Sequence, residues 1–164
     1  MQDAPLKVLF LCTGNSARSI MAEALLNYYG QGRFEAFSAG SNPVGEINPF
    51  VVETLNDVRI STAGLRSKSW NEFATARAPH LDVVITVCGN AAKEQCPIWY
   101  STPVNLHWGF ADPAAVKGPE IAKRYETRRV YSDIEYQIRK FVALPIENLT
   151  PQQLEAELRA IAPK

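Results

Sequence analysis

The 164-residue sequence has few cysteines, few histidines, no excess of either charge and no long apolar segment. Apolar runs such as Val8 to Cys12 are far shorter than the about 20 residues of a membrane-spanning helix. Lysine plus arginine equals aspartate plus glutamate at 17 each, and this balance argues against a nucleic-acid-binding protein. Asp3 and the lack of an apolar segment near the N-terminus predict no secretory signal peptide, so we expect a cytoplasmic protein.

The small numbers of cysteines and histidines also limit the kinds of site that the chain can form. Cys12, Cys88 and Cys96 are an odd number, which argues against a framework of static disulfides. Two histidines, together with a cysteine spacing unlike that of a zinc knuckle, predict no bound metal ion. On composition alone, the cysteines are also compatible with ordinary buried thiols.

Short apolar segments alternate with amphipathic segments along the chain. We expect strands at residues 7–12, 33–39, 81–88 and 104–107, and helices at 19–29, from 49, after 69, at 119–142 and from 151. Asn48 before Pro49 is a predicted N-cap, and Thr150 to Gln153 form a capping signature. Ser69 and Glu72 have the spacing of a capping box. The alternation is typical of an α/β fold with a parallel sheet covered on both faces. The length and the absence of a linker predict one domain over residues 1–164.

Three reactive side chains follow predicted strand ends. Cys12 ends the first strand, Cys88 ends the third, and Asp112 comes shortly after the fourth. Because ligands bind beyond the carboxyl ends of parallel strands, we expect these three residues at one edge of the sheet.

The segment from Cys12 to Ser19 connects the first strand to the first helix. Backbone N–H groups in such a turn form an anion-binding nest, and Gly14 and Asn15 both permit the positive φ that it needs. Arg18 is suited to clamp a tetrahedral oxyanion through its planar guanidinium. Because these groups and the Ser19 hydroxyl face Cys12, we expect a pKa below the usual value of about 8.5 and a nucleophilic thiolate.

Four segments resemble, in order, those of the low-molecular-weight tyrosine phosphatase superfamily and its arsenate reductase branch: CTGNSARSIMAEA at 12–24, LRSKSW at 65–70, DVVITVCGNAAKEQCP at 82–97 and HWGFADPA at 107–114. The resemblance covers nearly the whole chain. It implies a three-layer α/β/α sandwich with a four-stranded parallel sheet in the order 2-1-3-4. It also implies Asp112 as the general acid, Cys12, Arg18 and Ser19 as further catalytic residues, and oxyanion binding by Thr13, Gly14, Asn15, Ser16, Ala17 and Arg18.

The resemblance further implies a disulfide relay among Cys12, Cys88 and Cys96. Cys12 attacks arsenate, Cys88 attacks the Cys12 sulfur and releases arsenite, and Cys96 attacks Cys88 to restore Cys12. Thioredoxin, or glutathione with glutaredoxin, is then the external thiol donor, and no tightly bound cofactor is expected. The implied protein is a monomeric enzyme of arsenic detoxification that binds an arsenate- or phosphate-like oxyanion and retains some phosphatase activity.

Two other functions remain compatible with the sequence. The first is a phosphatase for phosphotyrosine or a small phosphomonoester, with a cysteinyl-phosphate intermediate on Cys12. Ala114 and Ala115 disfavour phosphotyrosine, because many phosphatases of the superfamily have an aromatic residue directly after the Asp-Pro pair. The second is a non-enzymatic oxyanion-binding module, which the presence of a nucleophile, an arginine and an acid disfavours.

Four residues near these motifs have simpler interpretations. Arg66 and Lys68 are expected in a solvated basic loop, although attraction of an oxyanion is an alternative role. His107 and Trp108 match the family pattern and are expected to pack at a strand end.

Overall fold

The computed structural model describes residues 4–89, 97 and 99–163 of the chain. Its centre is a sheet of four parallel strands in the order β2-β1-β3-β4, as the resemblance implies. The strands are β1 (Leu6–Cys12), β2 (Phe34–Gly40), β3 (Val83–Thr86) and β4 (Val104–His107). In the described part of the chain, no helix has the length and apolar character needed to cross a membrane.

Strand β3 is shorter than the predicted segment at residues 81–88. It pairs with β4 only over residues 83–86, so the regular strand ends at Thr86. The Val87 N–H nevertheless donates to the Leu11 carbonyl oxygen at 2.8 Å, which keeps the chain beside β1. Cys12 and Cys88 are therefore brought to adjacent strand ends.

Four α-helices are described in these ranges: α1 (Arg18–Tyr29), α2 (Pro49–Asp57), α4 (Glu120–Val142) and α5 (Pro151–Ala160). Two of them begin at the caps that the sequence predicts. Asn48 Oδ1 accepts the Phe50 N–H at 2.8 Å before α2, and Thr150 and Gln153 form a capping box at α5. Local sequence is therefore sufficient to define these helix starts.

The predicted capping box at Ser69 and Glu72 is not formed. Ser69 Oγ accepts the Asn71 N–H at 3.1 Å. The Glu72 carboxylate turns away and hydrogen-bonds the Arg66 guanidinium. The reciprocal bond is missing, and the short predicted helix is a 3-10 helix, Trp70–Phe73.

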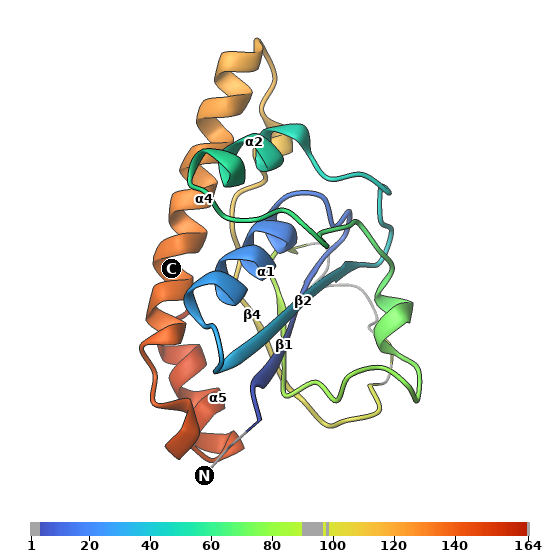
Figure 1. Ribbon diagram of the computed structural model, residues 1–164, viewed down its shortest axis with the longest axis vertical. Helices are drawn as coiled ribbons and strands as arrows, with labels where there is room; N and C mark the ends of the chain where they lie inside the picture. Colours follow the sequence, from blue (N-terminus) through green and yellow to red (C-terminus); the bar gives the residue numbers. More distant parts are fainter. Residues whose placement is uncertain (1–3, 90–96, 98, 164) are drawn as a thin grey trace.

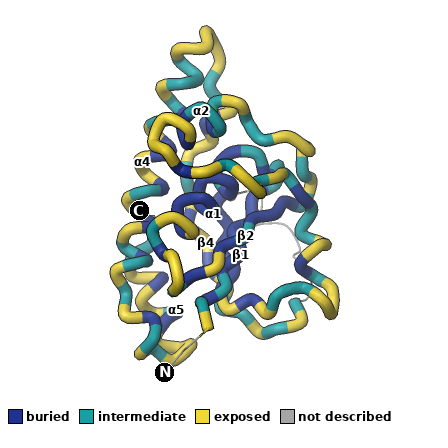
Figure 2. Tube along the Cα trace, in the orientation of Figure 1, coloured by how far each residue is buried: buried dark blue, intermediate teal, exposed yellow. Residues whose placement is uncertain are grey.

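The side chains of β1 alternate between two cores on opposite faces of the sheet. Val8 and Phe10 belong to the larger core, which also contains residues of α1, α2, α4 and α5. Leu9 and Leu11 belong to the smaller core, which includes Phe73 of the 3-10 helix. Figure 1 shows the α-helices on one side of the sheet and that short helix, in green, on the other. Figure 2 shows that the most continuous buried stretches of the chain follow the strands and α1.

Candidate active site

A cavity of about 170 Å³ lies beyond the carboxyl ends of β1 and β3. Its lining comes from the loop between β1 and α1, from the end of the β3 segment and from the segment after β4: Cys12, Thr13, Gly14, Asn15, Ser16, Ala17, Arg18, Cys88, Asp112 and Ala114. Three segments that are distant in sequence thus meet at the predicted edge of the sheet. Cys96, the third cysteine of the predicted relay, lies outside the described residues.

The loop between β1 and α1 is held from its outer side by the segment that follows β2. The C=O and N–H of one trans peptide group point in opposite directions. Three loop carbonyl oxygens accept hydrogen bonds from the segment after β2, so the N–H groups of the same peptides, those of Gly14, Asn15 and Ala17, point toward the cavity. These donors form a concave set that suits a tetrahedral oxyanion. The outer hydrogen bonds, at 2.9–3.0 Å, join Asn42 N to Thr13 O, Val44 N to Gly14 O, and Asn48 N to Ser16 O.

Asn15, and not Gly14, adopts the positive φ of this loop. Its φ is 47°, whereas Gly14 is outside the left-handed region. Asn15 Nδ2 donates to Ser19 Oγ at 2.8 Å and to Ser38 Oγ at 3.0 Å. Asn15 Oδ1 accepts the Lys68 N–H at 2.9 Å. The asparagine takes this position because its side chain, which glycine lacks, reaches all three partners.

Gly40, the last residue of β2, is a site residue that the sequence interpretation misses. A Cβ atom at this position would lie 2.4 Å from the Thr13 carbonyl oxygen and 2.8 Å from that of Cys12. Glycine is therefore required for the loop to approach β2 this closely. The only signal in the sequence is a glycine after a predicted strand, which is too common to identify such a role.

The side chains of Cys12 and Cys88 are buried, and both line the cavity. Thr13 holds Cys88 from the loop. Its N–H donates to Cys88 Sγ at 3.3 Å, and its hydroxyl lies 3.7 Å from the same sulfur. The two thiols are thus held at the same cavity, one of them through the residue that follows the other in sequence.

This environment raises the pKa of Cys12 above its usual value, contrary to the sequence expectation. The hydrogen bond with Cys88 is the largest cause, and burial is the second. The Arg18 charge and the Thr13 N–H lower the pKa, but they do not outweigh the other two. Sequence reasoning included the loop and Arg18, but the contact with Cys88 arises only when β1 and β3 pair.

Arg18 and Asp112 form an ion pair in the cavity lining. Arg18 Nη2 lies 3.6 Å from Asp112 Oδ2, and Arg18 Nη1 donates to the Phe110 carbonyl oxygen at 3.1 Å. Asp112 Oδ1 accepts the Ala114 N–H at 2.9 Å and so caps a short 3-10 turn. The Arg18 side chain is 15% exposed and that of Asp112 is 44% exposed. The acid therefore has access to water, as proton exchange requires.

Ser19 lies behind the loop, fully buried, where its Oγ accepts a hydrogen bond from Asn15. It is not among the residues that line the cavity, and it supports the loop through Asn15. A larger cavity of about 570 Å³, lined partly by Tyr136 and Lys140 of α4, has no cysteine among its lining residues. Among the described residues, no group of three His, Cys, Asp or Glu side chains is arranged to hold a metal ion.

Trp108 has the packing role that the sequence predicts, whereas His107 is exposed. Trp108 is buried, stacks edge-on against Phe141 and donates its Nε1–H to the Leu158 carbonyl oxygen at 3.2 Å. His107 Nδ1 lies 2.8 Å from Thr86 Oγ1. Both residues thus connect β4 to its neighbours.

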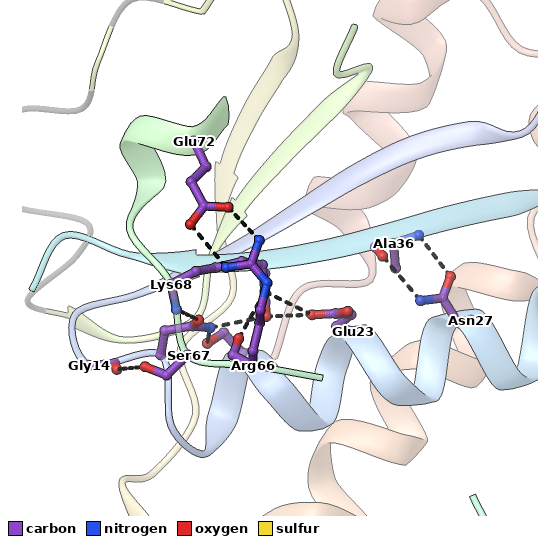
Figure 3. A network of polar contacts seen from close by, with 11 residues as sticks. Gly14, Glu23, Asn27, Ala36, Arg66, Ser67, Lys68 and Glu72 are labelled. Atoms are coloured by element: carbon purple, nitrogen blue, oxygen red, sulfur yellow. Dashed lines mark hydrogen bonds and ion pairs between the residues drawn. The ribbon is translucent and has the colours of Figure 1, made fainter. Parts of the chain in front are cut away.

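Lys68 is buried, which corrects the prediction of a solvated basic loop. Its Nζ lies 3.8 Å from Glu23 Oε1 and donates to the Arg66 carbonyl oxygen at 2.9 Å. The Arg66 side chain is exposed and paired with Glu72, as the prediction requires. Figure 3 shows these two ion pairs side by side. Glu23 is a second residue that sequence reasoning misses, although it lies four residues after Ser19 and hence on the same helix face.

Comparison with protein families and with known sequences gives results that agree with each other. Residues 7–159 match the family described as low molecular weight phosphotyrosine protein phosphatase. An arsenate reductase of Shouchella clausii (strain KSM-K16) is 37% identical over 134 residues, which cover 82% of this chain and 93% of that protein. The similarity therefore extends over most of both chains.

Solved structures share the fold as well. The crystal structure of an arsenate reductase from Archaeoglobus fulgidus DSM 4304 matches with a TM-score of 0.64 and 27% identity, over 84% of this chain and 99% of that chain. A thioredoxin-dependent arsenate reductase from Corynebacterium glutamicum matches with a TM-score of 0.60 and 25% identity, over 85% of this chain and 61% of that chain. The sequence matches and the structural matches thus point to the same group of proteins.

Proposed function

The chain belongs to the low molecular weight phosphotyrosine protein phosphatase family, and from this premise we propose that it is an enzyme that reduces arsenate to arsenite. One observation carries the proposal: Cys88 lines the oxyanion cavity together with Cys12, and the N–H of Thr13, the residue after Cys12, donates to Cys88 Sγ at 3.3 Å. A phosphatase needs only the first thiol. Reduction of As(V) to As(III) needs two electrons, which two thiols supply when they become a disulfide. The relatives named arsenate reductase support the same reaction.

In the first step, the loop binds arsenate and Cys12 Sγ attacks the arsenic atom. The inward N–H groups and Arg18 hold the charged oxygen atoms. An S–As bond forms, an As–O bond breaks, and the thiol proton leaves with the hydroxyl group as water. Asp112 takes up this thiol proton and delivers it to the leaving oxygen. Because the thiol proton is used in this way, Cys12 can begin the reaction as a thiol, in keeping with its raised pKa.

In the second step, Cys88 Sγ attacks Cys12 Sγ. An S–S bond forms and the S–As bond breaks, so its electron pair passes to arsenic. Arsenic is reduced to As(III) and leaves as arsenite, which takes up the proton of Cys88. The Thr13 N–H, 3.3 Å from Cys88 Sγ, orients this sulfur and stabilises negative charge on it as the proton departs.

The remaining steps regenerate the Cys12 thiol. Cys96 attacks Cys88, which transfers the disulfide to Cys88–Cys96 and restores Cys12. A dithiol protein of the thioredoxin type then reduces this disulfide, and the thioredoxin-dependent relative supports that donor. Glutathione with glutaredoxin is the alternative donor. We place the cycle in the cytoplasm, where such donors keep thiols reduced.

A phosphatase is the second candidate, because the family match and the oxyanion loop both favour it. Cys12 would form a cysteinyl-phosphate that water hydrolyses, with Asp112 protonating the leaving oxygen. Ala114, the residue after Pro113, lines the cavity and offers a methyl group where an aryl substrate would need a ring. We therefore expect weak hydrolysis of aryl phosphates.

The test is arsenate-dependent NADPH oxidation with thioredoxin and its reductase, run in parallel with glutathione, glutaredoxin and glutathione reductase. We expect multiple turnover by the wild-type protein and its loss in Cys88→Ser and Cys96→Ser. Turnover only with glutathione would keep Cys12 as the nucleophile and assign one resolving step to the small thiol. No turnover with either system, together with rapid hydrolysis of an aryl phosphate, would leave the phosphatase.

A further inference from the structure

A polar network behind the oxyanion loop contains an ion pair that the proposed reaction does not use. Lys68 is 8% exposed, and lysines are almost never so buried unless they are paired. Its Nζ lies 3.8 Å from Glu23 Oε1, and the Glu23 side chain is 12% exposed. Because burying two charges costs free energy, stability alone does not explain this pair.

Both members of the ion pair are connected to one side chain of the loop, that of Asn15. On one side, Ser38 Oγ donates to Glu23 Oε1 at 2.5 Å and accepts a hydrogen bond from Asn15 Nδ2 at 3.0 Å. On the other, the Lys68 backbone N–H donates to Asn15 Oδ1 at 2.9 Å. Figure 3 shows Lys68 and Glu23 pointing toward each other.

Asn15 is the residue whose backbone shapes the loop. Its φ of 47° is one that asparagine adopts more readily than other residues with a Cβ atom, and its side-chain hydrogen bonds fix it there. The Ser38 hydroxyl, which accepts the hydrogen bond from Asn15, is itself oriented by donating to the Glu23 carboxylate. The Lys68 ammonium favours the ionised form of that carboxylate, against the burial that raises its pKa.

We propose that Lys68 is a positioning residue of the oxyanion site. Lys68 holds the loop in its anion-binding conformation through Glu23 and Asn15. It acts by fixing the direction of the loop N–H groups and does not touch the bound oxyanion. The proposal rests on the proposed function only in taking this loop as the oxyanion site. It applies equally to arsenate and to phosphate, which have the same shape and charge.

The first test measures binding of inorganic phosphate to the reduced protein by titration calorimetry, together with kcat and KM for arsenate. Lys68→Met removes the charge and keeps most of the side-chain length. We expect it to raise the phosphate Kd and the arsenate KM about tenfold, with a smaller change in kcat. Arg66→Met is the matched control, because it removes an exposed charge two residues away and leaves the Arg66 carbonyl in place. We expect its Kd to stay near the wild-type value.

Glu23→Gln separates positioning from simple attraction of the anion. If Lys68 attracted the oxyanion by its charge, removing the nearby negative charge would tighten phosphate binding. Under the proposal, Glu23→Gln weakens it, and adding Lys68→Met to this variant has little further effect, because both residues act in one network. The glutamine is isosteric, so this variant carries the test even if Lys68→Met does not fold.

Two results would overturn the proposal. One is wild-type phosphate affinity in Lys68→Met or Glu23→Gln with only a lower Tm, which would show a purely structural role. The other is tighter phosphate binding in Glu23→Gln. If the wild-type protein reduces no arsenate but its phosphate affinity still falls in these variants, the proposed function fails and the positioning role stands.

Discussion

Cys12 and Cys88 meet at one cavity beyond the carboxyl ends of two neighbouring parallel strands, β1 and β3. The contact follows from the sheet order, because β3 lies directly beside β1 and the chain stays hydrogen-bonded to Leu11 at Val87. In the proposed reaction, the same two sulfur atoms become a disulfide when they give two electrons to arsenic. The resting contact is thus the starting geometry of the redox step.

Cys88→Ala is expected to lower the pKa of Cys12, because the hydrogen bond with Cys88 is the largest cause that raises it. A raised thiol pKa means less thiolate at a given pH, so removing the contact increases the thiolate fraction. Each pKa unit changes that fraction about tenfold at neutral pH, and we expect alkylation of Cys12 to accelerate about tenfold or more. The measurement is the pH dependence of iodoacetamide labelling, located by mass spectrometry. An unchanged pH profile would refute this assignment.

Arg18→Lys should keep the positive charge of the site but lose the planar fork and the hydrogen bond to Phe110. We expect kcat/KM for arsenate to fall about 10²- to 10³-fold, as when one preorganised donor is removed. Steady-state kinetics with the coupled assay measure this effect. Arg77→Lys, at an exposed position, is the control and should behave as the wild type.

Asp112→Asn retains an oxygen that can cap the Ala114 N–H but removes the acid. Formation of the Cys12–arsenate adduct should slow by about 10²- to 10⁴-fold, the usual contribution of a general acid. Phosphate should bind at least as tightly as to the wild type, because a negative charge near Arg18 is lost. Rapid-quench single-turnover measurements and calorimetry separate the two effects. A wild-type rate of adduct formation would assign the proton transfer to another group.

Gly40→Ala is expected to destabilise the protein by about 1–3 kcal/mol, because the added Cβ would overlap the loop backbone at Thr13. Phosphate affinity should fall with it, since the loop must move. Chemical denaturation and calorimetry measure the two quantities. Gly89→Ala, where an added Cβ meets no atom of the described residues within 4 Å, is the control for stability. Equal stability of the two variants would show that the loop tolerates the movement.

Sequence alone predicts the sheet and the edge where the site forms, since these depend on local patterns. The apolar residues of β1 indicate a strand buried on both faces, and Asn48 and Thr150 cap helices through neighbours two or three residues away. The order of the strands comes from the resemblance, because no local pattern specifies which strands pair. The catalytic roles of all six residues stay predictions: Cys12, Arg18, Ser19, Asp112, Cys88 and Cys96.

Features that depend on distant residues could not be predicted in this way. The pKa of Cys12 rises because the fold places Cys88 beside it, and Lys68 is buried because Glu23 on α1 pairs with it. The role of Gly40 depends on the distance between β2 and the loop. In each case, the sequence supplies the residue type, and the tertiary contact determines what that residue does.

The central claim is that Cys12 and Cys88 together supply the two electrons that reduce arsenate. The most direct test incubates the reduced Cys96→Ser variant with arsenate and no thiol donor, then measures released arsenite and locates disulfides by mass spectrometry. We predict one arsenite per protein molecule and one disulfide, between Cys12 and Cys88. Arsenate reduction without this disulfide, or a protein that binds arsenate and releases no arsenite, would contradict the account.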